Sequence, residues 1–486
     1  MIKAFDGKLH LGYIFHPKSA DLNMHYKTIH ELAPHIKSGD LSPVELAQSQ
    51  LNRIEKLDGT LKAYATVTGE QAMQEARQAE QQIAKGNYRG PLHGIPIALK
   101  DLCDTTGIKT MGGSYVFRDN IPKSDATVVK KLRKAGAVSL GKLNMTEGAM
   151  GGYNPKFEIP ENPWRESHWS GASSSGSGAA TAAGLAYGAL GSDTGGSIRH
   201  PAAVCGVVGL KPTWGLVSRY GIMDLAPSLD HVGPLTRSSI DAGIMLQAIS
   251  GQDPNDPTTL TGDVPDMLIG IGKGVSKLRI GWDEDYSSVD MEASFYEAVS
   301  NGVKLLESLG AEIIPVKMPE IMREALNAWP VICTSEAALA HSSTYPSESD
   351  HYGPFFREWL EIGAGYSAQD YAEAHHSRLM MNGALENTMM GIDVLACPST
   401  AKASYPVTPE LLYGPIPPDR DPWSGRFTVP YDFAGLPTIA LPCGLNTDGM
   451  PVSLQIAGHH LSEPLLVRIG DTFETASDFH NLHPVI

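Results

Sequence analysis

The sequence is short of positive charge and has no long hydrophobic run. Lys and Arg together number 38 and Asp and Glu number 54, so the formal net charge at pH 7 is −16. A surface with this excess of negative charge repels phosphate backbones and anionic membranes, so we expect neither a nucleic acid nor a membrane as a partner. The most apolar stretch, residues 179–190, is an Ala/Gly run well below the ~20 apolar residues that span a bilayer.

Cysteines are also few. The 5 cysteines are widely separated and never form a C-x-x-C pair, which predicts free thiols in a reducing compartment. Residues 1–26 carry charges throughout and lack the apolar core of a secretion signal, so we expect a cytoplasmic protein. The composition, 42% hydrophobic and 19% charged, is that of an ordinary globular chain. We expect residues 1–25 to be an N-terminal extension and residues 26–486 to form one domain.

Motifs for several other chemistries are absent. No Gly-rich segment ends in the Lys-Ser/Thr pair of a phosphate-binding loop, and Gly176–Gly178 lacks the third glycine of a Rossmann turn. No His-Glu-x-x-His pair of metal ligands occurs, so we expect neither a metal nor a cofactor. No Gly-x-Ser-x-Gly surrounds the candidate serines described below, which argues against a nucleophile elbow. A Ser-His-Asp arrangement with His168, His200 or His231 stays open as an alternative.

From Leu92 onward, short apolar runs alternate with helical segments, which is typical of an α/β fold. Residues 95–99 predict a buried strand that ends at Lys100. We expect Asp125 to cap a helix that closes at Gly136. The other predicted helices begin near Thr28 and Ser42 or lie at 70–85, 238–250, 295–306, 367–390 and 463–476, and the other predicted strands lie at 137–140, 278–281, 392–397, 438–442 and 452–456.

Two further segments have less regular patterns. Residues 179–190 predict a buried helix, because they are almost entirely small and apolar. Residues 405–422 contain many prolines and predict an irregular surface loop. This loop either borders a substrate entrance or is a solvated connector.

The density of Gly and Ser over residues 170–201 is one that a packed helix or strand disfavours. The apolar residues within this segment favour an ordered turn over a flexible linker. Gly195 and Gly196 precede Ser197, so successive N–H groups can point one way and bind an anion beside a hydroxyl. We interpret the segment as the site of a nucleophilic serine.

Seven segments, spread from about Leu92 to Gly458, resemble the amidase signature enzymes. They are Pro96–Asp101, Asp125–Val128, Gly141–Met145, Gly171–Ser177, Gly191–Arg199, Cys205–Thr213 and Phe433–Pro437. The resemblance implies the amidase signature fold, an α/β architecture with a central mixed, twisted β-sheet covered by helices on both faces. It also implies that the domain 26–486 is a single amidase signature domain, with its signature core at about residues 92–215.

The same resemblance implies a Ser-cisSer-Lys triad. Ser197 is the implied nucleophile, Ser173 the bridging serine in a cis peptide, and Lys100 the base. A lysine acts as a base only where burial lowers its pKa, and Lys100 ends an apolar run in which this can occur. The implied oxyanion donors are the N–H groups of four consecutive residues, Thr194, Gly195, Gly196 and Ser197.

The implied reaction cleaves the C–N bond of an amide through an acyl-enzyme on Ser197, and aryl amides, esters or carbamates present the same kind of carbonyl. Ala172 and Ser175 stand where the family usually has glycine, which leaves Ser174 as a second candidate for the proton relay. A non-catalytic binding protein on the same fold is an alternative, against which the intact triad residues argue.

The family also contains the glutaminase component of glutamyl-tRNA amidotransferase, and this is the alternative function. That branch usually has an acidic residue just before the Phe-Thr-Val-Pro stretch, whereas Ser424-Gly425-Arg426 precedes it here. We therefore expect a stand-alone amidase that acts on a small-molecule amide, with a homodimer as the default assembly. The expected substrate pocket includes small and apolar residues of one segment, namely Ala149, Met150, Gly151 and Tyr153.

Overall fold

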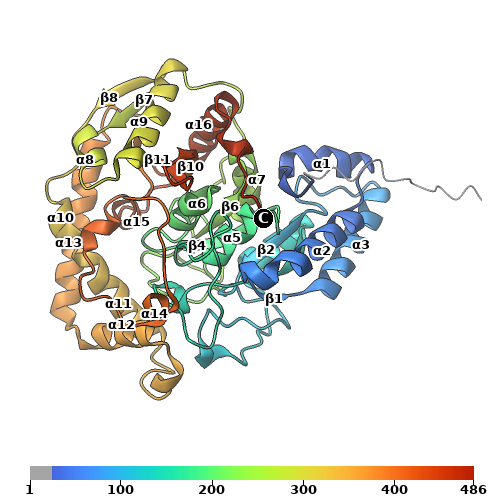
Figure 1. Ribbon diagram of the computed structural model, residues 1–486, viewed down its shortest axis with the longest axis horizontal. Coiled ribbons are helices and arrows are strands. Elements are labelled where there is room, and N and C mark those ends of the chain that lie inside the picture. The colour runs from blue at the N-terminus through green and yellow to red at the C-terminus, as the bar shows by residue number, and fades with distance from the viewer. Residues whose placement is uncertain (1–23) are drawn as a thin grey trace, which may run out of the picture.

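The computed structural model describes residues 24–486, and an 11-stranded mixed β-sheet forms its centre. The strand order is β1-β3-β2-β4-β6-β5-β10-β11-β9-β7-β8. Strands β2, β3 and β4 are parallel, as are β7, β8 and β9, and the other neighbours are antiparallel. Helices flank this sheet on both faces (Figure 1), which confirms the expected α/β architecture with a central mixed sheet.

The strands are β1 Tyr64–Val67, β2 Pro96–Lys100, β3 Val138–Leu143, β4 Gly188–Asp193, β5 Val208–Lys211, β6 His231–Thr236, β7 Arg279–Trp282, β8 Glu312–Pro315, β9 Val394–Pro398, β10 Thr438–Leu445 and β11 Pro451–Gly458. The α-helices are α1 Ile29–Ser38, α2 Pro43–Leu61, α3 Gly69–Ala84, α4 Thr127–Ala135, α5 Ser175–Ala182, α6 Arg199–Cys205, α7 Ser239–Ile249, α8 Glu284–Ser288, α9 Ala293–Ser308, α10 Met322–Ala325, α11 Ala328–Ala340, α12 Pro354–Gly365, α13 Ala368–Thr388, α14 Pro409–Tyr413, α15 Val429–Phe433 and α16 Glu463–Ala476. Short 3-10 helices lie at Met24–Tyr26, Tyr115–Phe117, Glu147–Ala149, Ser349–His351, Pro422–Gly425 and Phe479–Asn481.

The helices gather in groups around the sheet. Figure 1 shows α1, α2 and α3 at one end of the molecule, near β1, and α11, α12 and α13 on the side away from them. The expected N-terminal extension, residues 1–25, lies outside the described residues except for Met24 and His25. No helix among residues 24–486 is both long and apolar enough to cross a membrane.

Local sequence signals explain several helix boundaries. The hydroxyl of Thr28 accepts the Glu31 N–H while the Glu31 carboxylate accepts the Thr28 N–H, which caps the start of α1. Gly39 ends α1 with φ of 83°, a left-handed conformation that favours glycine. Helix α9 contains the helix predicted at residues 295–306, and its Phe295 and Val299 side chains are buried.

Two predictions about local structure are wrong. Asp125 does not cap α4, whose N-cap is Ala126, because the Asp125 carboxylate accepts the Thr106 N–H and pairs with Arg133 instead. Residues 179–190 are not one helix, because the chain turns at Gly184 with φ of 67° before β4 begins. Both halves of that segment are buried, so its apolar composition fitted a helix and a strand equally well.

The prediction of free thiols is confirmed. All five cysteines, Cys103, Cys205, Cys333, Cys397 and Cys443, are free and buried. Burial raises the pKa of the Cys397 thiol to about 11, so this thiol is protonated and unreactive at neutral pH.

Candidate active site

Two parallel strands place Lys100 next to a cluster of serine hydroxyls. Strand β2 is buried along its whole length and pairs with β4, with Leu99 opposite Leu190. Lys100 therefore ends β2 inside the molecule, with 0% of its surface exposed. Its Nζ lies 2.7 Å from the Ser173 Oγ, and the hydroxyls of Ser174 and Ser192 are each 2.9 Å away.

This environment favours the uncharged amine. Burial lowers the pKa of Lys100 from its ordinary value to about 7, and Cys103, Asp193 and Asp230 oppose the shift only in part. The three contacts within hydrogen-bond distance are hydroxyls, so no carboxylate stabilises the ammonium form directly. Near neutral pH a substantial fraction of Lys100 can therefore accept a proton.

Their hydrogen bonds distinguish Ser173 from Ser174, the two candidates for the proton relay. The Ser174 hydroxyl donates to the Ser192 carbonyl and accepts the Ser192 N–H, both at 3.2 Å, in addition to its contact with Lys100. The Ser173 hydroxyl has Lys100 as its one partner in the described part of the chain. The Ala172–Ser173 peptide is cis. Ser173 is thus the serine whose second hydrogen-bonding position is free to receive a proton from a nucleophile.

The turn that carries Ser197 is shaped by Asp193. The Asp193 carboxylate accepts the N–H groups of Gly196 at 2.6 Å, Ile198 at 3.0 Å and Arg199 at 3.3 Å. The Gly196 N–H is therefore already used. In contrast, the N–H groups of Gly195 and Ser197 donate to no acceptor within residues 24–486.

Gly196 requires the absence of a side chain. Its φ is +131°, and a Cβ there would lie 2.5 Å from the His200 ring. Ser197 follows as a half-buried residue that lines a cavity.

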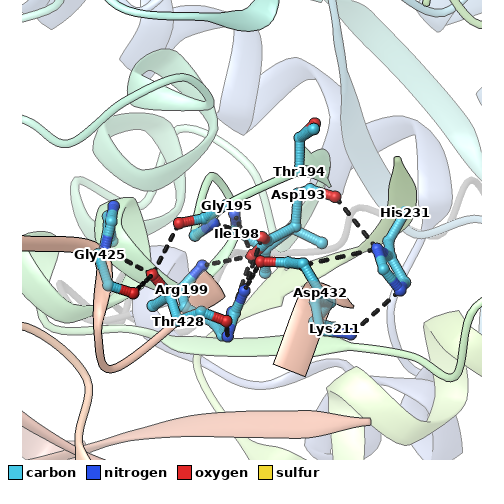
Figure 2. Close-up of polar contacts among 12 residues, drawn as sticks. Asp193, Thr194, Gly195, Ile198, Arg199, Lys211, His231, Gly425, Thr428 and Asp432 are labelled. Atoms are coloured by element: carbon cyan, nitrogen blue, oxygen red, sulfur yellow. Dashed lines mark hydrogen bonds and ion pairs between the residues drawn. The ribbon is translucent and has the colours of Figure 1, made fainter. Parts of the chain in front are cut away.

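A buried charge network supports this turn from behind (Figure 2). The Arg199 guanidinium lies between two carboxylates, with Nη2 at 2.8 Å from Asp193 and 2.7 Å from Asp432, and all three side chains are fully buried. Lys211 and His231 extend the network, with 3.1 Å between the Lys211 Nζ and the His231 Nε2. Asp193 and Arg199 therefore have a structural role in holding this turn.

The two carboxylates of the network differ in protonation. Burial alone raises the pKa of Asp193, but Arg199 and backbone N–H groups outweigh it and hold this pKa well below its usual range. Burial raises the pKa of Asp432 to about 8, although Arg199 lowers it in part. The negative charge therefore resides on Asp193, where it orders the turn before Ser197.

We expect Arg199→Met to lower the free energy of unfolding by about 3–5 kcal/mol, because it leaves the buried, charged Asp193 carboxylate without its cation. Urea unfolding followed by circular dichroism measures this change. The matched variant Arg323→Met removes a guanidinium whose side chain is 62% exposed, and we expect a change within about 0.5 kcal/mol. Equal effects of the two substitutions would contradict a structural role for the Arg199 network.

The cavity in front of Ser197 has a volume of about 370 Å³. The four expected pocket residues, Ala149, Met150, Gly151 and Tyr153, all line it. Its wall also contains the aromatic side chains of Trp169, Trp329, Phe355 and Tyr405. An adjoining chamber of about 450 Å³ shares some of the same lining residues. Leu412, Pro417 and Arg420 contribute to the wall, so the Pro-rich segment borders the cavity, the first of its two expected roles.

The histidines near the site do not complete a Ser-His-Asp arrangement. His168 contacts the Glu166 carbonyl at 3.0 Å, His200 lies 3.4 Å from the Thr428 hydroxyl, and His231 contacts Lys211 and the Asp193 carbonyl. Within the described residues, none of these three rings hydrogen-bonds to Ser197. No cluster of three or more His, Cys, Asp or Glu residues in that part of the chain is arranged to hold a metal ion.

Comparison with known proteins identifies the family of this chain. Residues 45–467 match the sequence profile of the Amidase family. The chain belongs to the amidase signature family. "Putative amidase AmiD" of Mycobacterium tuberculosis (strain ATCC 25618 / H37Rv) is 41% identical over 458 residues, which cover 94% of this chain and 95% of that protein. This amidase is therefore a hydrolase of amides.

Other relatives include both branches of the family. The A component of the glutamyl-tRNA(Gln) amidotransferase of Moorella thermoacetica (strain ATCC 39073 / JCM 9320) is 37% identical over 493 residues, covering 95% of this amidase and 99% of that protein. A crystal structure of the peptide amidase PAM in complex with the competitive inhibitor chymostatin superimposes with a TM-score of 0.83, at 30% identity, covering 95% of this amidase and 99% of that chain.

Sequence reasoning missed several residues of the amidase site. Ser192 contacts Lys100 because β2 and β4 are neighbours in the sheet, and no local sequence pattern predicts this strand pairing. Trp329 on α11 donates its Nε1–H to the Thr194 carbonyl at 3.0 Å and packs over Gly195. Arg420 lines the cavity from the Pro-rich segment. The aromatic residues carried no positional signal, since isolated Trp and Phe residues are usually part of a core.

Proposed function

We propose that this amidase cleaves amides through an acyl-enzyme on Ser197, with Ser173 and Lys100 moving the proton. The observation that carries the proposal is the contact of 2.7 Å between the Ser173 hydroxyl and a buried amine whose pKa is lowered to about 7. A serine hydroxyl is a weak nucleophile until a base takes its proton, and a neutral lysine is such a base.

In the proposed reaction, the Ser197 Oγ attacks the substrate carbonyl. Its proton passes to the Ser173 Oγ, while the Ser173 proton passes to the Lys100 Nζ. The return of a proton along the same path to the departing nitrogen breaks the C–N bond and leaves the acyl group on Ser197. Water then attacks this ester, with Ser173 and Lys100 again accepting the proton, and the acid is released.

The proposed oxyanion hole uses the N–H groups of Thr194, Gly195 and Ser197. The Gly196 N–H, the fourth expected donor, is bound to Asp193 and orders the turn instead. Removing one such donor lowers kcat by about 10²–10³-fold in enzymes where it has been tested.

The lining of the cavity favours a stand-alone amidase over the glutaminase of an amidotransferase. Free glutamine carries an ammonium group, which an acidic side chain would bind. No Asp or Glu lines the cavity in front of Ser197 in residues 24–486. Glu358 lines the adjoining chamber, but its carboxylate accepts the Ile416 N–H at 2.9 Å. The three residues directly before Phe427, which are Ser424, Gly425 and Arg426, likewise include no acidic residue.

A fluorophosphonate probe tests the proposal directly. We expect covalent labelling of the purified protein at one residue, which peptide mass spectrometry assigns to Ser197. A substrate panel of para-nitroanilides, aliphatic amides, esters, carbamates and glutamine then defines the reaction, with arylamide or aliphatic amide turnover above that of glutamine. Complete inertness to the probe would support a non-catalytic binding protein. Preferential glutamine hydrolysis, or co-purification with a second subunit, would support the amidotransferase alternative.

A further inference from the structure

The cavity in front of Ser197 is lined by two cations that have no acidic partner. Lys402 and Arg420 both line it, and neither forms an ion pair within the described residues. The Lys402 Nζ lies 4.1 Å from the centre of the Tyr405 ring, a cation–π contact that leaves its N–H donors unused. A chain with a formal net charge of −16 thus has a positive lining at this cavity.

Arg420 is held by aromatic rings and not by carboxylates. Its guanidinium carbon lies 5.2 Å from the centre of the Trp359 ring and 5.8 Å from those of Trp329 and Phe355. Its backbone N–H donates to the Pro417 carbonyl, and its guanidinium donates to no acceptor among residues 24–486. The residue nevertheless stays exposed. The rings restrict the guanidinium while its N–H donors remain available to a ligand.

The surroundings of Arg420 do not neutralise its charge. Desolvation by the packed neighbours lowers the pKa of the Arg420 guanidinium, and no carboxylate opposes this shift. Glu358, which lines the same adjoining chamber, accepts the Ile416 N–H and makes no ion pair with Arg420. A positive charge that is crowded but unpaired is stabilised when an anion binds to it.

We propose that this amidase selects amides that carry a carboxylate, and that Arg420 binds this carboxylate. The inference rests on the proposed catalytic role of Ser197 and names the substrate class of that site. A planar guanidinium matches a carboxylate with two parallel hydrogen bonds, and Arg420 and Ser197 line the same cavity. Trp329 and Phe355 provide an apolar wall for the remainder of the substrate.

Two matched substrate pairs test the proposal by kinetics. The first compares the mono-para-nitroanilide of glutaric acid with pentanoyl-para-nitroanilide, which places the carboxylate on the acyl side. The second compares para-acetamidobenzoate with para-methylacetanilide, which places it on the amine side. We expect the wild-type kcat/KM to favour the anionic member of at least one pair. Arg420→Gln should lower that anionic-to-neutral ratio by about 10–100-fold, as expected for the loss of a charged hydrogen-bonded pair.

Two further variants separate recognition from general charge and packing. Arg420→Lys retains the charge without the planar fork, and we expect an intermediate ratio. Arg323→Gln removes a guanidinium that stacks on Trp423 but does not line the cavity, and we expect the wild-type ratio. A ratio that changes less than threefold in Arg420→Gln for both pairs, or one that falls equally in Arg323→Gln, would overturn the proposal.

A binding measurement keeps this proposal separate from the catalytic one. Calorimetric titration of Ser197→Ala with para-acetamidobenzoate and with the glutaric acid mono-para-nitroanilide gives their Kd values without turnover. We expect Ser197→Ala combined with Arg420→Gln to raise Kd by about 10–100-fold for the preferred anion. If wild type resists the fluorophosphonate probe and hydrolyses neither pair, the catalytic proposal fails, while these Kd values still decide the role of Arg420. Equal Kd values with and without Arg420 would refute the proposed binding of the carboxylate by Arg420.

Discussion

Replacement of Ser197 by alanine is expected to lower kcat for amide hydrolysis by about 10⁴–10⁶-fold, since it removes the proposed nucleophile. The fold should be preserved, because Ser197 is half-buried at the cavity wall and its hydroxyl makes no hydrogen bond within residues 24–486. We expect the free energy of unfolding to change by less than about 0.5 kcal/mol. Steady-state kinetics with the best substrate of the panel and urea unfolding measure the two effects.

The control for this variant is Ser177→Ala in the same Gly/Ser-rich segment. Ser177 is buried in α5, and its hydroxyl donates to the Leu190 carbonyl at 2.8 Å. Loss of this hydrogen bond should destabilise the protein by about 1 kcal/mol while the activity of the folded enzyme is retained. If Ser197→Ala kept more than a hundredth of the wild-type kcat, Ser197 would not be the nucleophile.

Replacement of Lys100 by methionine is expected to lower kcat by about 10⁴-fold, because the proton of Ser197 then has no base to receive it. The wild-type pH profile gives an independent test. Burial lowers the pKa of Lys100 to about 7, so the amine is protonated below that pH and neutral above it. With the neutral amine as the proposed base, kcat/KM should rise with pH, reach half its maximum near 7 and then level off. A lysine with the ordinary pKa of about 10.4 would instead give a rate that still rises above pH 9.

Lys142 provides a matched control for Lys100. It is also a fully buried lysine, at the neighbouring strand β3, but it contacts the Cys103 carbonyl and the Thr110 hydroxyl and pairs with Asp101 at 3.3 Å. Lys142→Met should destabilise the fold and leave the midpoint of the pH profile unchanged. A midpoint that moved in this variant, or a wild-type rate independent of pH between 5 and 9, would contradict the role of Lys100.

Local chemistry explains why some elements were predictable and others were not. The start of α1 at Thr28 and the helix at residues 295–306 depend on residues close together in the sequence, and both predictions were confirmed. The proposed cap by Asp125 failed because Arg133 and the Thr106 N–H compete for its carboxylate in the folded chain. Residues 179–190 failed as a helix because burial on all sides removes the periodicity that distinguishes a helix from a strand.

For the site, motif positions and spatial contacts made different contributions. The order of the signature segments nominated Lys100, Ser173 and Ser197, and the structure places the Lys100 amine against the Ser173 hydroxyl. The same segments did not decide between Ser173 and Ser174 as the proton relay. The hydrogen bonds of Ser174 to the Ser192 backbone, which favour Ser173 as the relay, are visible only in the structure. They also nominated Gly196 as an oxyanion donor, although its N–H is bound to Asp193.

The sequence by itself determined the family and the α/β class, and it nominated the residues that we propose carry the chemistry, because these are encoded in ordered motifs and in local periodicity. Only the tertiary structure decided that Ser192 lies beside Lys100, that Asp432 shares Arg199 with Asp193, and that Arg420 reaches the cavity of Ser197. Those contacts join residues that are far apart along the chain. They depend on strand order and on the path of one irregular segment, neither of which leaves a pattern in neighbouring residues.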